Sequence, residues 1–156
     1  MAAIDHGADV RFPPPLIYLV FLALGILANV WYPLLLLPAP LAWALGGLLI
    51  AAGALLGPIW GVHVLRRAGT TIRPDKPSEN LVTSGPFRFS RNPLYLALTL
   101  IYAGAAIVAD SGWALLLLIP VILIMRRFVI GREEAYLART FGEEYERYKG
   151  AVRRWL

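Results

Sequence analysis

The sequence predicts an all-α integral membrane protein with about four transmembrane helices, arranged as two hairpins and followed by a C-terminal amphipathic cytoplasmic helix. Hydrophobic residues make up 58% and charged residues 16% of the 156 positions, whereas soluble domains contain about 45–50% and about 25%. Charge-free apolar runs of about twenty residues, the length needed to cross a bilayer, recur along the chain. A chain of this length forms one domain, so we expect a single membrane domain over residues 1–156.

Four apolar runs are the candidate membrane spans. They extend from about Pro15 to Leu37, Leu41 to Leu65, Pro93 to Ala109 and Trp113 to Ile130. Because the connections at 38–40 and 110–112 are very short, the helices on either side of each should run antiparallel. We expect an N-terminal hairpin (1–65), a cytoplasmic loop (66–92), a second hairpin (93–130), and an amphipathic helix with a tail (131–156).

Small residues and prolines distinguish the interiors of these spans. Gly53, Gly57 and Gly61 follow one another at intervals of four, a spacing that lets membrane helices approach closely. They could pack within one chain or between chains, so the oligomeric state stays open. Pro58 and Pro120 lie inside the second and fourth spans and predict kinks there.

Lysine and arginine lie on one side of the predicted spans. Of the 15, one precedes the first span, six fall in the 66–92 loop and eight lie at or beyond the end of the fourth span. In that order they are Arg11; Arg66, Arg67, Arg73, Lys76, Arg88 and Arg91; then Arg126, Arg127, Arg132, Arg139, Arg147, Lys149, Arg153 and Arg154. The positive-inside rule then places both termini and the central loop in the cytoplasm, and we expect the bacterial inner membrane. Positive charge beside apolar spans favours anionic membrane lipids, and not nucleic acid, as partners.

Several classes of chemistry are excluded or disfavoured. The chain has no cysteine, which excludes disulfides, thiolate metal sites and a cysteine nucleophile. It contains no P-loop, dinucleotide-binding or zinc-protease motif, and we expect no metal site. The middle of each span is free of charge, which argues against a proton-coupled transporter.

The stretch from 132 to 149 predicts the amphipathic helix. Leu137, Phe141, Tyr145 and Tyr148 recur at spacings of four, four and three, which places them on one helical face. Such a helix lies along the membrane or packs on the central loop.

The central loop is long beside the other connections, and long loops in compact proteins are usually functional or disordered. Its end contains Asn92-Pro93, a favourable helix start in which Asn caps and Pro takes the first helical position. Arg91, Asn92 and Tyr95 would then cluster at a helix N-terminus, which favours an anionic group. The alternative is that the loop is solvated and only sets the membrane topology, and that Asn92 only caps the following helix.

Arg132, Glu133 and Glu134 directly follow the last span. They could simply be a charged helix start that stops translocation, with the glutamates complementing the helix dipole. Topology favours a functional interpretation, because this cluster and the Arg91 cluster both lie on the predicted cytoplasmic face.

Two segments resemble the isoprenylcysteine carboxyl methyltransferases. One is Leu81-Val82-Thr83-Ser84-Gly85-Pro86-Phe87-Arg88-Phe89-Ser90-Arg91-Asn92-Pro93-Leu94-Tyr95; the other comprises Glu133-Glu134, Leu137, Phe141-Gly142-Glu143-Glu144-Tyr145, Tyr148, Val152 and Arg154-Trp155-Leu156. The related membrane phospholipid methyltransferases are similar in the same C-terminal half. The resemblance covers about residues 61 to 156.

The resemblance implies S-adenosylmethionine as methyl donor, bound without a Rossmann domain between the central loop and the C-terminal helix. It implies that the residues in contact with S-adenosylmethionine, in order from its adenine to its polar end, are Leu81, Val82, Gly85, Pro86, Phe87, Arg91, Asn92 and Tyr95. Glu133 or Glu134 would close the site from the other side. Many family members have His where this chain has Asn92. An amide does not titrate near neutral pH, so cofactor binding is a better role for Asn92 than general base.

The expected activity is methyl transfer to a carboxylate of a prenylated or lipid-like amphiphile. A carboxylate is already ionised and needs an orienting cation, for which Arg91 and Arg132 are the candidates. An amine acceptor, as in phospholipid methylation, would lose a proton that Glu133 or Glu134 could accept. A different class is a non-enzymatic membrane protein such as a transporter or assembly factor, which should not bind S-adenosylmethionine.

Overall fold

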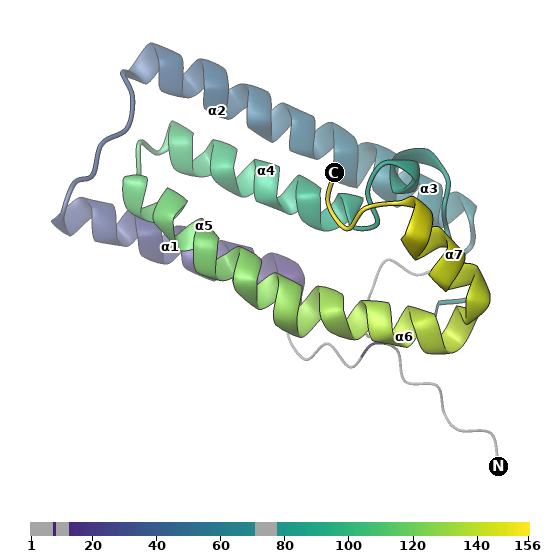
Figure 1. Ribbon diagram of the computed structural model, residues 1–156. Helices are drawn as coiled ribbons and strands as arrows, with labels where there is room; N and C mark the ends of the chain where they lie inside the picture. Colours follow the sequence, from purple (N-terminus) through teal and green to yellow (C-terminus); the bar gives the residue numbers. More distant parts are fainter. Residues whose placement is uncertain (1–7, 9–12, 71–77) are drawn as a thin grey trace.

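The computed structural model describes residue 8, residues 13–70 and residues 78–156, and these parts are helical without a strand (Figure 1). Arg11, Arg73 and Lys76, three of the cations used to predict topology, lie outside the described residues. The helices are α1 (Pro14–Trp31), α2 (Ala39–Ala54), η1 (Leu55–Gly61), α3 (Val62–Arg67), η2 (Gly85–Arg88), α4 (Pro93–Val108), α5 (Gly112–Ile124), η3 (Met125–Ile130), α6 (Gly131–Phe141) and α7 (Glu143–Ala151).

In the part of the chain that the structure describes, three helices are long and apolar enough to cross a membrane, which makes the chain an integral membrane protein. They are α1 and two continuous helical rods, one of 29 residues formed by α2, η1 and α3 (Ala39–Arg67) and one of 30 residues formed by α5, η3 and α6 (Gly112–Phe141). Each rod contains a π-helical stretch, η1 or η3, and Pro58 lies within η1. Helix α4 is apolar but has 16 residues, about 24 Å at 1.5 Å per residue, against a hydrocarbon core of about 30 Å. The predicted third span is therefore a shorter helix than the other three.

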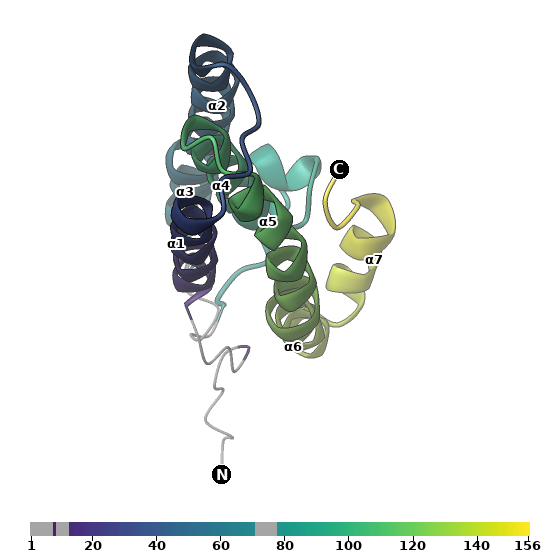
Figure 2. The ribbon, with the colours of Figure 1, turned by 90° about the vertical axis from the view of Figure 1, so that its left-hand side faces the viewer.

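Helix packing does not follow the order of the chain. Although α1 and α2 are consecutive, α2 packs along α4 and α1 packs along α5 (Figures 1 and 2). The predicted N-terminal hairpin therefore has its two helices packed on different partners. The α1, α4 and α5 helices enclose a buried core that includes Tyr18, Tyr102, Ala114 and Val121.

Glycines allow the close contact between α2 and α4. A Cβ atom at Gly46 would lie 2.6 Å from the carbonyl oxygen of Gly104, and one at Gly53 would lie 2.7 Å from that of Ala97. A Cβ atom at Gly57 would lie 2.6 Å from the Cβ of Ala97. The glycines of the second predicted span thus pack within the chain, against α4.

The C-terminal region is two helices where the sequence predicted one across 132–149. Helix α6 continues the rod that begins with α5, and α7 starts after Gly142. Gly142 has φ 52°, a conformation that residues with a side chain rarely adopt. The break turns α7 back toward η2 and the start of α4 (Figure 1), which brings the two motif segments together.

Candidate functional site

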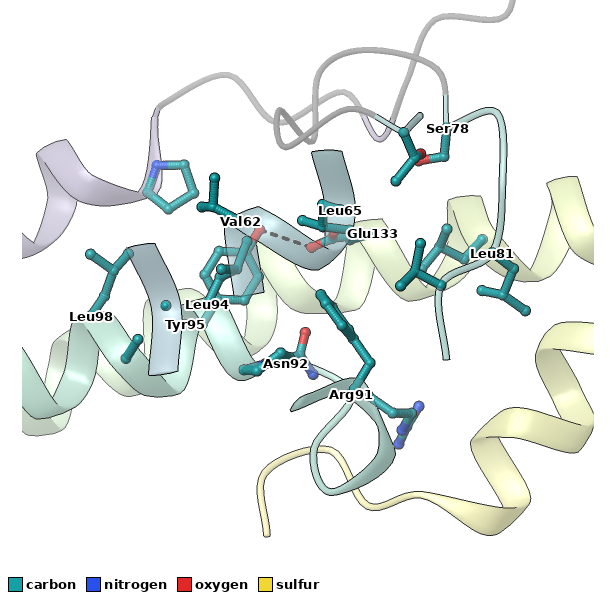
Figure 3. A pocket seen from close by; sticks show the side chains of 18 of the residues that line it. Val62, Leu65, Ser78, Leu81, Arg91, Asn92, Leu94, Tyr95, Leu98 and Glu133 are labelled. Carbon is teal, nitrogen blue, oxygen red and sulfur yellow. Dashed lines mark hydrogen bonds between the residues drawn. The ribbon is translucent and has the colours of Figure 1, made fainter. Parts of the chain in front are cut away.

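A cavity of about 730 Å³ opens where the two motif segments meet. Its walls come from the start of α1, from η1 and α3, from the segment after residue 78, from the first half of α4, and from α6 and α7. Figure 3 shows these elements around it. The cavity therefore depends on contacts between segments far apart in the sequence.

The cavity has an apolar half along α4. Its wall includes Leu98 and Ile101 of α4 and, from η1, Gly57 and Pro58. From Asn92 to Ile101 the wall extends about 14 Å at 1.5 Å per residue. This half suits a hydrocarbon chain or another elongated apolar group.

The other half is polar and contains a hydrogen-bonded pair. The Tyr95 hydroxyl donates a hydrogen bond to Oε2 of Glu133 over 2.8 Å, and both residues line the cavity (Figure 3). Glu133 is the sole carboxylate and Arg91 the sole cation among the described lining residues. The cavity therefore holds one group that can accept a proton and one that can bind an anion.

Arg91 has an unused donor. Its NH1 atom lies 3.0 Å from Oε1 of Glu134 and 3.4 Å from the Tyr145 hydroxyl, to which it donates. Its Nε atom is buried and has no hydrogen-bond partner within the described part of the chain. The hydroxyl of Thr70, another lining residue, is also buried without one. Buried polar groups are normally paired, so both groups fit contacts to a bound ligand.

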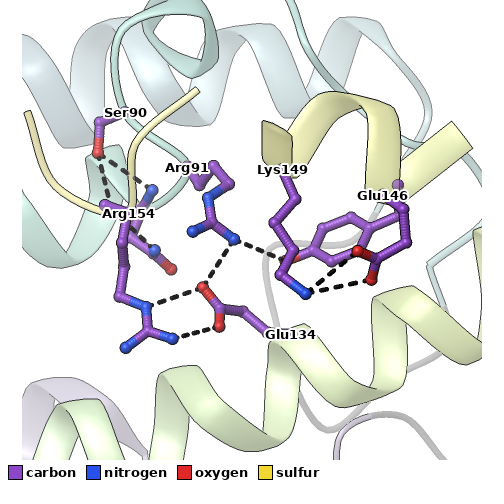
Figure 4. Close-up of polar contacts among 8 residues, drawn as sticks. Ser90, Arg91, Glu134, Glu146, Lys149 and Arg154 are labelled. Atoms are coloured by element: carbon purple, nitrogen blue, oxygen red, sulfur yellow. Dashed lines mark hydrogen bonds and ion pairs between the residues drawn. The ribbon is translucent and has the colours of Figure 1, made fainter. Parts of the chain in front are cut away.

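Glu134 does not line the cavity, because two guanidinium groups hold it outside. Besides Arg91, it accepts hydrogen bonds from Nε and NH2 of Arg154, over 3.0 and 2.6 Å (Figure 4). The hydrogen bond to Glu134 raises the pKa of Arg154. Such two-point guanidinium–carboxylate contacts fix orientation as well as charge.

Asn92 precedes α4, as predicted, but its side chain makes no capping hydrogen bond. The side-chain nitrogen donates to the carbonyl oxygen of Arg154 over 3.0 Å instead. The prediction that the Asn92 amide caps the helix is therefore wrong. Its amide fastens the start of α4 to the C-terminal tail.

Two tyrosines of α7 complete the polar half. Tyr148 donates to the carbonyl oxygen of Phe87 over 2.7 Å, and Tyr145 packs edge-to-face against Tyr148 with ring centroids 6.3 Å apart. Burial raises the pKa of both tyrosines, so both phenols stay neutral and can donate hydrogen bonds at physiological pH. Both belong to the second motif segment, which was the signal in the sequence that pointed to them, although neither was predicted as a site residue.

The structure brings most of the predicted site residues to the cavity. Those that line it are Leu81, Val82, Phe87, Arg91, Asn92, Tyr95 and Glu133. Those that do not are Gly85, Pro86, Arg132 and Glu134. Gly85 lies against Val64 and Trp60, Pro86 is buried, and Arg132 is exposed. The predicted roles of these residues in binding or catalysis stay predictions.

The described residues contain no cluster of three or more potential metal ligands. The chemistry available in the cavity is hydrogen bonding, ion pairing and proton transfer. Together with the apolar half, this defines an integral membrane protein with a cavity that is polar at one end and apolar at the other.

Comparison with known proteins gives the family. Residues 41–144 match the family model of the phospholipid methyltransferases. Because the match covers more than half of the chain, this chain belongs to the phospholipid methyltransferase family, and it is a membrane methyltransferase. It is also similar to an uncharacterized protein of Haemophilus influenzae, with 46% identity over 63 residues that cover 40% of this chain and 100% of that protein. No solved structure matches.

Proposed function

We propose that the protein is an S-adenosylmethionine-dependent methyltransferase of lipid-like acceptors. One observation carries the proposal: two segments that resemble methyltransferase motifs meet around a single cavity with a polar and an apolar half. The polar half would hold the methyl donor and the reacting group of the acceptor. The apolar half along α4 would hold the hydrocarbon part of the acceptor.

The lining residues fit the donor. A volume of about 730 Å³ is typical of small-molecule sites. The unpaired Nε of Arg91 suits the carboxylate of the donor, and Leu81, Val82 and Phe87 offer apolar surface for its adenine. When bound, S-adenosylmethionine supplies an electrophilic methyl group.

An amine is the acceptor group that the geometry supports best. Glu133 lines the cavity, and the hydrogen bond from Tyr95 holds its carboxylate in place. Glu133 would take a proton from the ammonium group of the acceptor, which frees the nitrogen lone pair to attack the methyl carbon. The carbon–sulfur bond would break as the carbon–nitrogen bond forms, and S-adenosylhomocysteine would leave. Such an acceptor agrees with the match to the phospholipid methyltransferases.

A carboxylate acceptor, as in the isoprenylcysteine carboxyl methyltransferases, is the second candidate. Arg91 favours it, because a guanidinium with a free donor can orient a carboxylate. The second cation predicted for this task, Arg132, does not line the cavity. Arg91 would then bind the carboxylate of the acceptor. The carboxylate of the methyl donor would be bound by uncharged hydrogen-bonding groups of the cavity instead.

We further propose that α4 forms a fourth, short span and that the termini are cytoplasmic. Support for the span comes from the close packing of α4 against α2. Support for the orientation comes from the cations, which cluster near the cavity end of the bundle in the described chain. The donor is made in the cytoplasm, so the cavity must open on that side.

Binding of S-adenosylhomocysteine, measured by titration calorimetry on the full chain in lipid nanodiscs, tests the function. We expect saturable one-site binding that Arg91→Ala weakens by at least about tenfold, the equivalent of 1.4 kcal/mol, without loss of the protein from the membrane. Arg127→Ala is the matched control, because Arg127 is an exposed arginine of η3 that does not line the cavity. Absence of binding by the unmodified chain would refute the proposal, and unchanged binding by Arg91→Ala would refute the placement of the donor.

Product chemistry separates the two acceptors. The purified chain would be incubated with methyl-labelled donor and either an amine-headgroup phospholipid or a long-chain prenylated carboxylic acid. Base-stable label in the phospholipid supports the amine. Base-labile label in the acid would establish a methyl ester and exclude Glu133 as the required base.

A further inference from the structure

The C-terminal tail after α7 runs beside the loop that carries Arg91. The backbone nitrogen of Arg91 donates to the carbonyl oxygen of Arg153 over 2.9 Å, and Asn92 donates to that of Arg154 over 3.0 Å. Trp155 packs against the hydrophobic core of the bundle. The tail is therefore held in place at its end by Trp155, and its hydrogen bonds fix the backbone of Arg91 and Asn92.

The side chain of Arg154 also reaches Arg91, but through a carboxylate. Arg154 contacts both oxygens of Glu134, over 3.0 and 2.6 Å, and one of these oxygens lies 3.0 Å from NH1 of Arg91 (Figure 4). The exposed fractions of the Arg91 and Glu134 side chains are 11% and 13%. Among these three residues, Arg91 alone lines the cavity.

The charge balance of this cluster shows what Arg154 contributes. Two guanidinium groups share one carboxylate, so the cluster keeps a net positive charge next to the cavity. Without Arg154, Glu134 would offer both oxygens to Arg91, and guanidinium groups favour such two-point pairing with a carboxylate. Arg91 would then be neutralised and turned toward Glu134.

We propose that Arg154 is a positioning residue that acts through Glu134 to keep Arg91 available to an anionic group in the cavity. The ligand site therefore includes the tail, although the tail does not line the cavity. This inference rests on the proposed function, because the anionic group is taken to belong to the donor or the acceptor.

Titration of S-adenosylhomocysteine into the full chain in nanodiscs tests the inference. We expect Arg154→Ala to raise the Kd about tenfold, and Arg154→Lys, which keeps the charge and loses the two-point contact, to raise it a fewfold. Lys149→Ala is the matched control: Lys149 is an exposed cation of α7 that pairs with Glu146 and not with Glu134. A merely structural role for Arg154 would reduce the folded fraction without changing the Kd of the protein that remains folded.

A double-mutant cycle shows whether Arg154 acts through Glu134. Once Glu134→Gln has removed the bridging carboxylate, Arg154→Ala should change the Kd by less than about twofold, because coupled residues are not additive. Equal Kd values for the unmodified chain and Arg154→Ala would overturn the inference, and so would additive effects in the cycle. Absence of binding by the unmodified chain would instead overturn the proposed function and the inference with it.

Discussion

Glu133 and Glu134 are neighbours in the chain, yet their carboxylates do different things. Successive residues of an α-helix point about 100° apart, so the two side chains of α6 cannot face the same surroundings. Glu133 lines the cavity and accepts from Tyr95, whereas Glu134 lies between Arg91 and Arg154. Glu133 faces the cavity, and Glu134 pairs with Arg91, the cation that lines it.

The hydrogen bond between Tyr95 and Glu133 predicts how the loss of one hydroxyl group changes the rate of methyl transfer. Tyr95→Phe deletes the hydroxyl that donates to Glu133 over 2.8 Å. A hydrogen bond to a charged group contributes about 1.5–3 kcal/mol, so we expect methyl transfer to fall by about 10- to 100-fold. The measurement is kcat/KM with labelled donor and the acceptor that product analysis identifies.

Tyr102→Phe is the matched control for this change. Tyr102 is another buried tyrosine of α4, and its hydroxyl donates to the carbonyl oxygen of Ala114 over 2.9 Å without lining the cavity. Its loss should lower the thermal midpoint modestly and leave kcat/KM within about twofold. Similar kcat/KM values for Tyr95→Phe and the unmodified chain would show that Glu133 needs no fixed orientation.

At the scale of elements, the contact between α2 and α4 depends on glycine. The two backbones approach so closely that a Cβ at Gly104 would lie 2.5 Å from the carbonyl oxygen of Gly46 and 2.8 Å from Ile50. Backbone atoms cannot move aside as a flexible side chain does. The contact matters for the site, because α4 carries Tyr95 and the apolar wall of the cavity.

Gly104→Ala should therefore destabilise the protein despite the better helix propensity of alanine. Overpacking costs about 1–3 kcal/mol, against a gain of up to about 1 kcal/mol from propensity. Thermal unfolding in detergent should show a lower midpoint for this variant. At Gly47, one residue from Gly46, an added Cβ meets nothing within 4 Å, and Gly47→Ala should keep or raise the midpoint; a fall as large as that of Gly104→Ala would contradict the packing argument.

At the scale of the whole molecule, the orientation in the membrane can be tested by cysteine labelling. The chain has no cysteine, so any label on it must be at the cysteine that is introduced. Ala39 is the first residue of α2 and Gly150 belongs to α7, and both are exposed. The start of α2 and helix α7 lie at opposite ends of the bundle (Figure 1). Ala39→Cys should react with a membrane-impermeant maleimide in intact spheroplasts, whereas Gly150→Cys should react in inverted vesicles. The reverse pattern would place the cavity on the side that lacks the methyl donor.

Much of the molecule could be predicted from local patterns. Apolar runs and short connections located the long helices, because the bilayer and the backbone impose length and hydrophobicity. Helix α4 matches the predicted third span to within one residue, whereas the C-terminal stretch predicted as one helix is broken at Gly142. Seven of the predicted site residues line the cavity, among them Arg91, Tyr95 and Glu133.

The sequence by itself determined that the protein lies in a membrane, where its long apolar helices are, and which two segments contribute residues to the cavity. These properties depend on composition, periodicity and motif, which are local. Only the tertiary structure decided that α2 packs on α4, that Glu133 and not Glu134 faces the cavity, and that Arg154 pairs with Glu134. Those outcomes depend on the rotational phase of each helix and on contacts between residues far apart in the chain, such as Asn92 and Arg154, which are 62 positions apart.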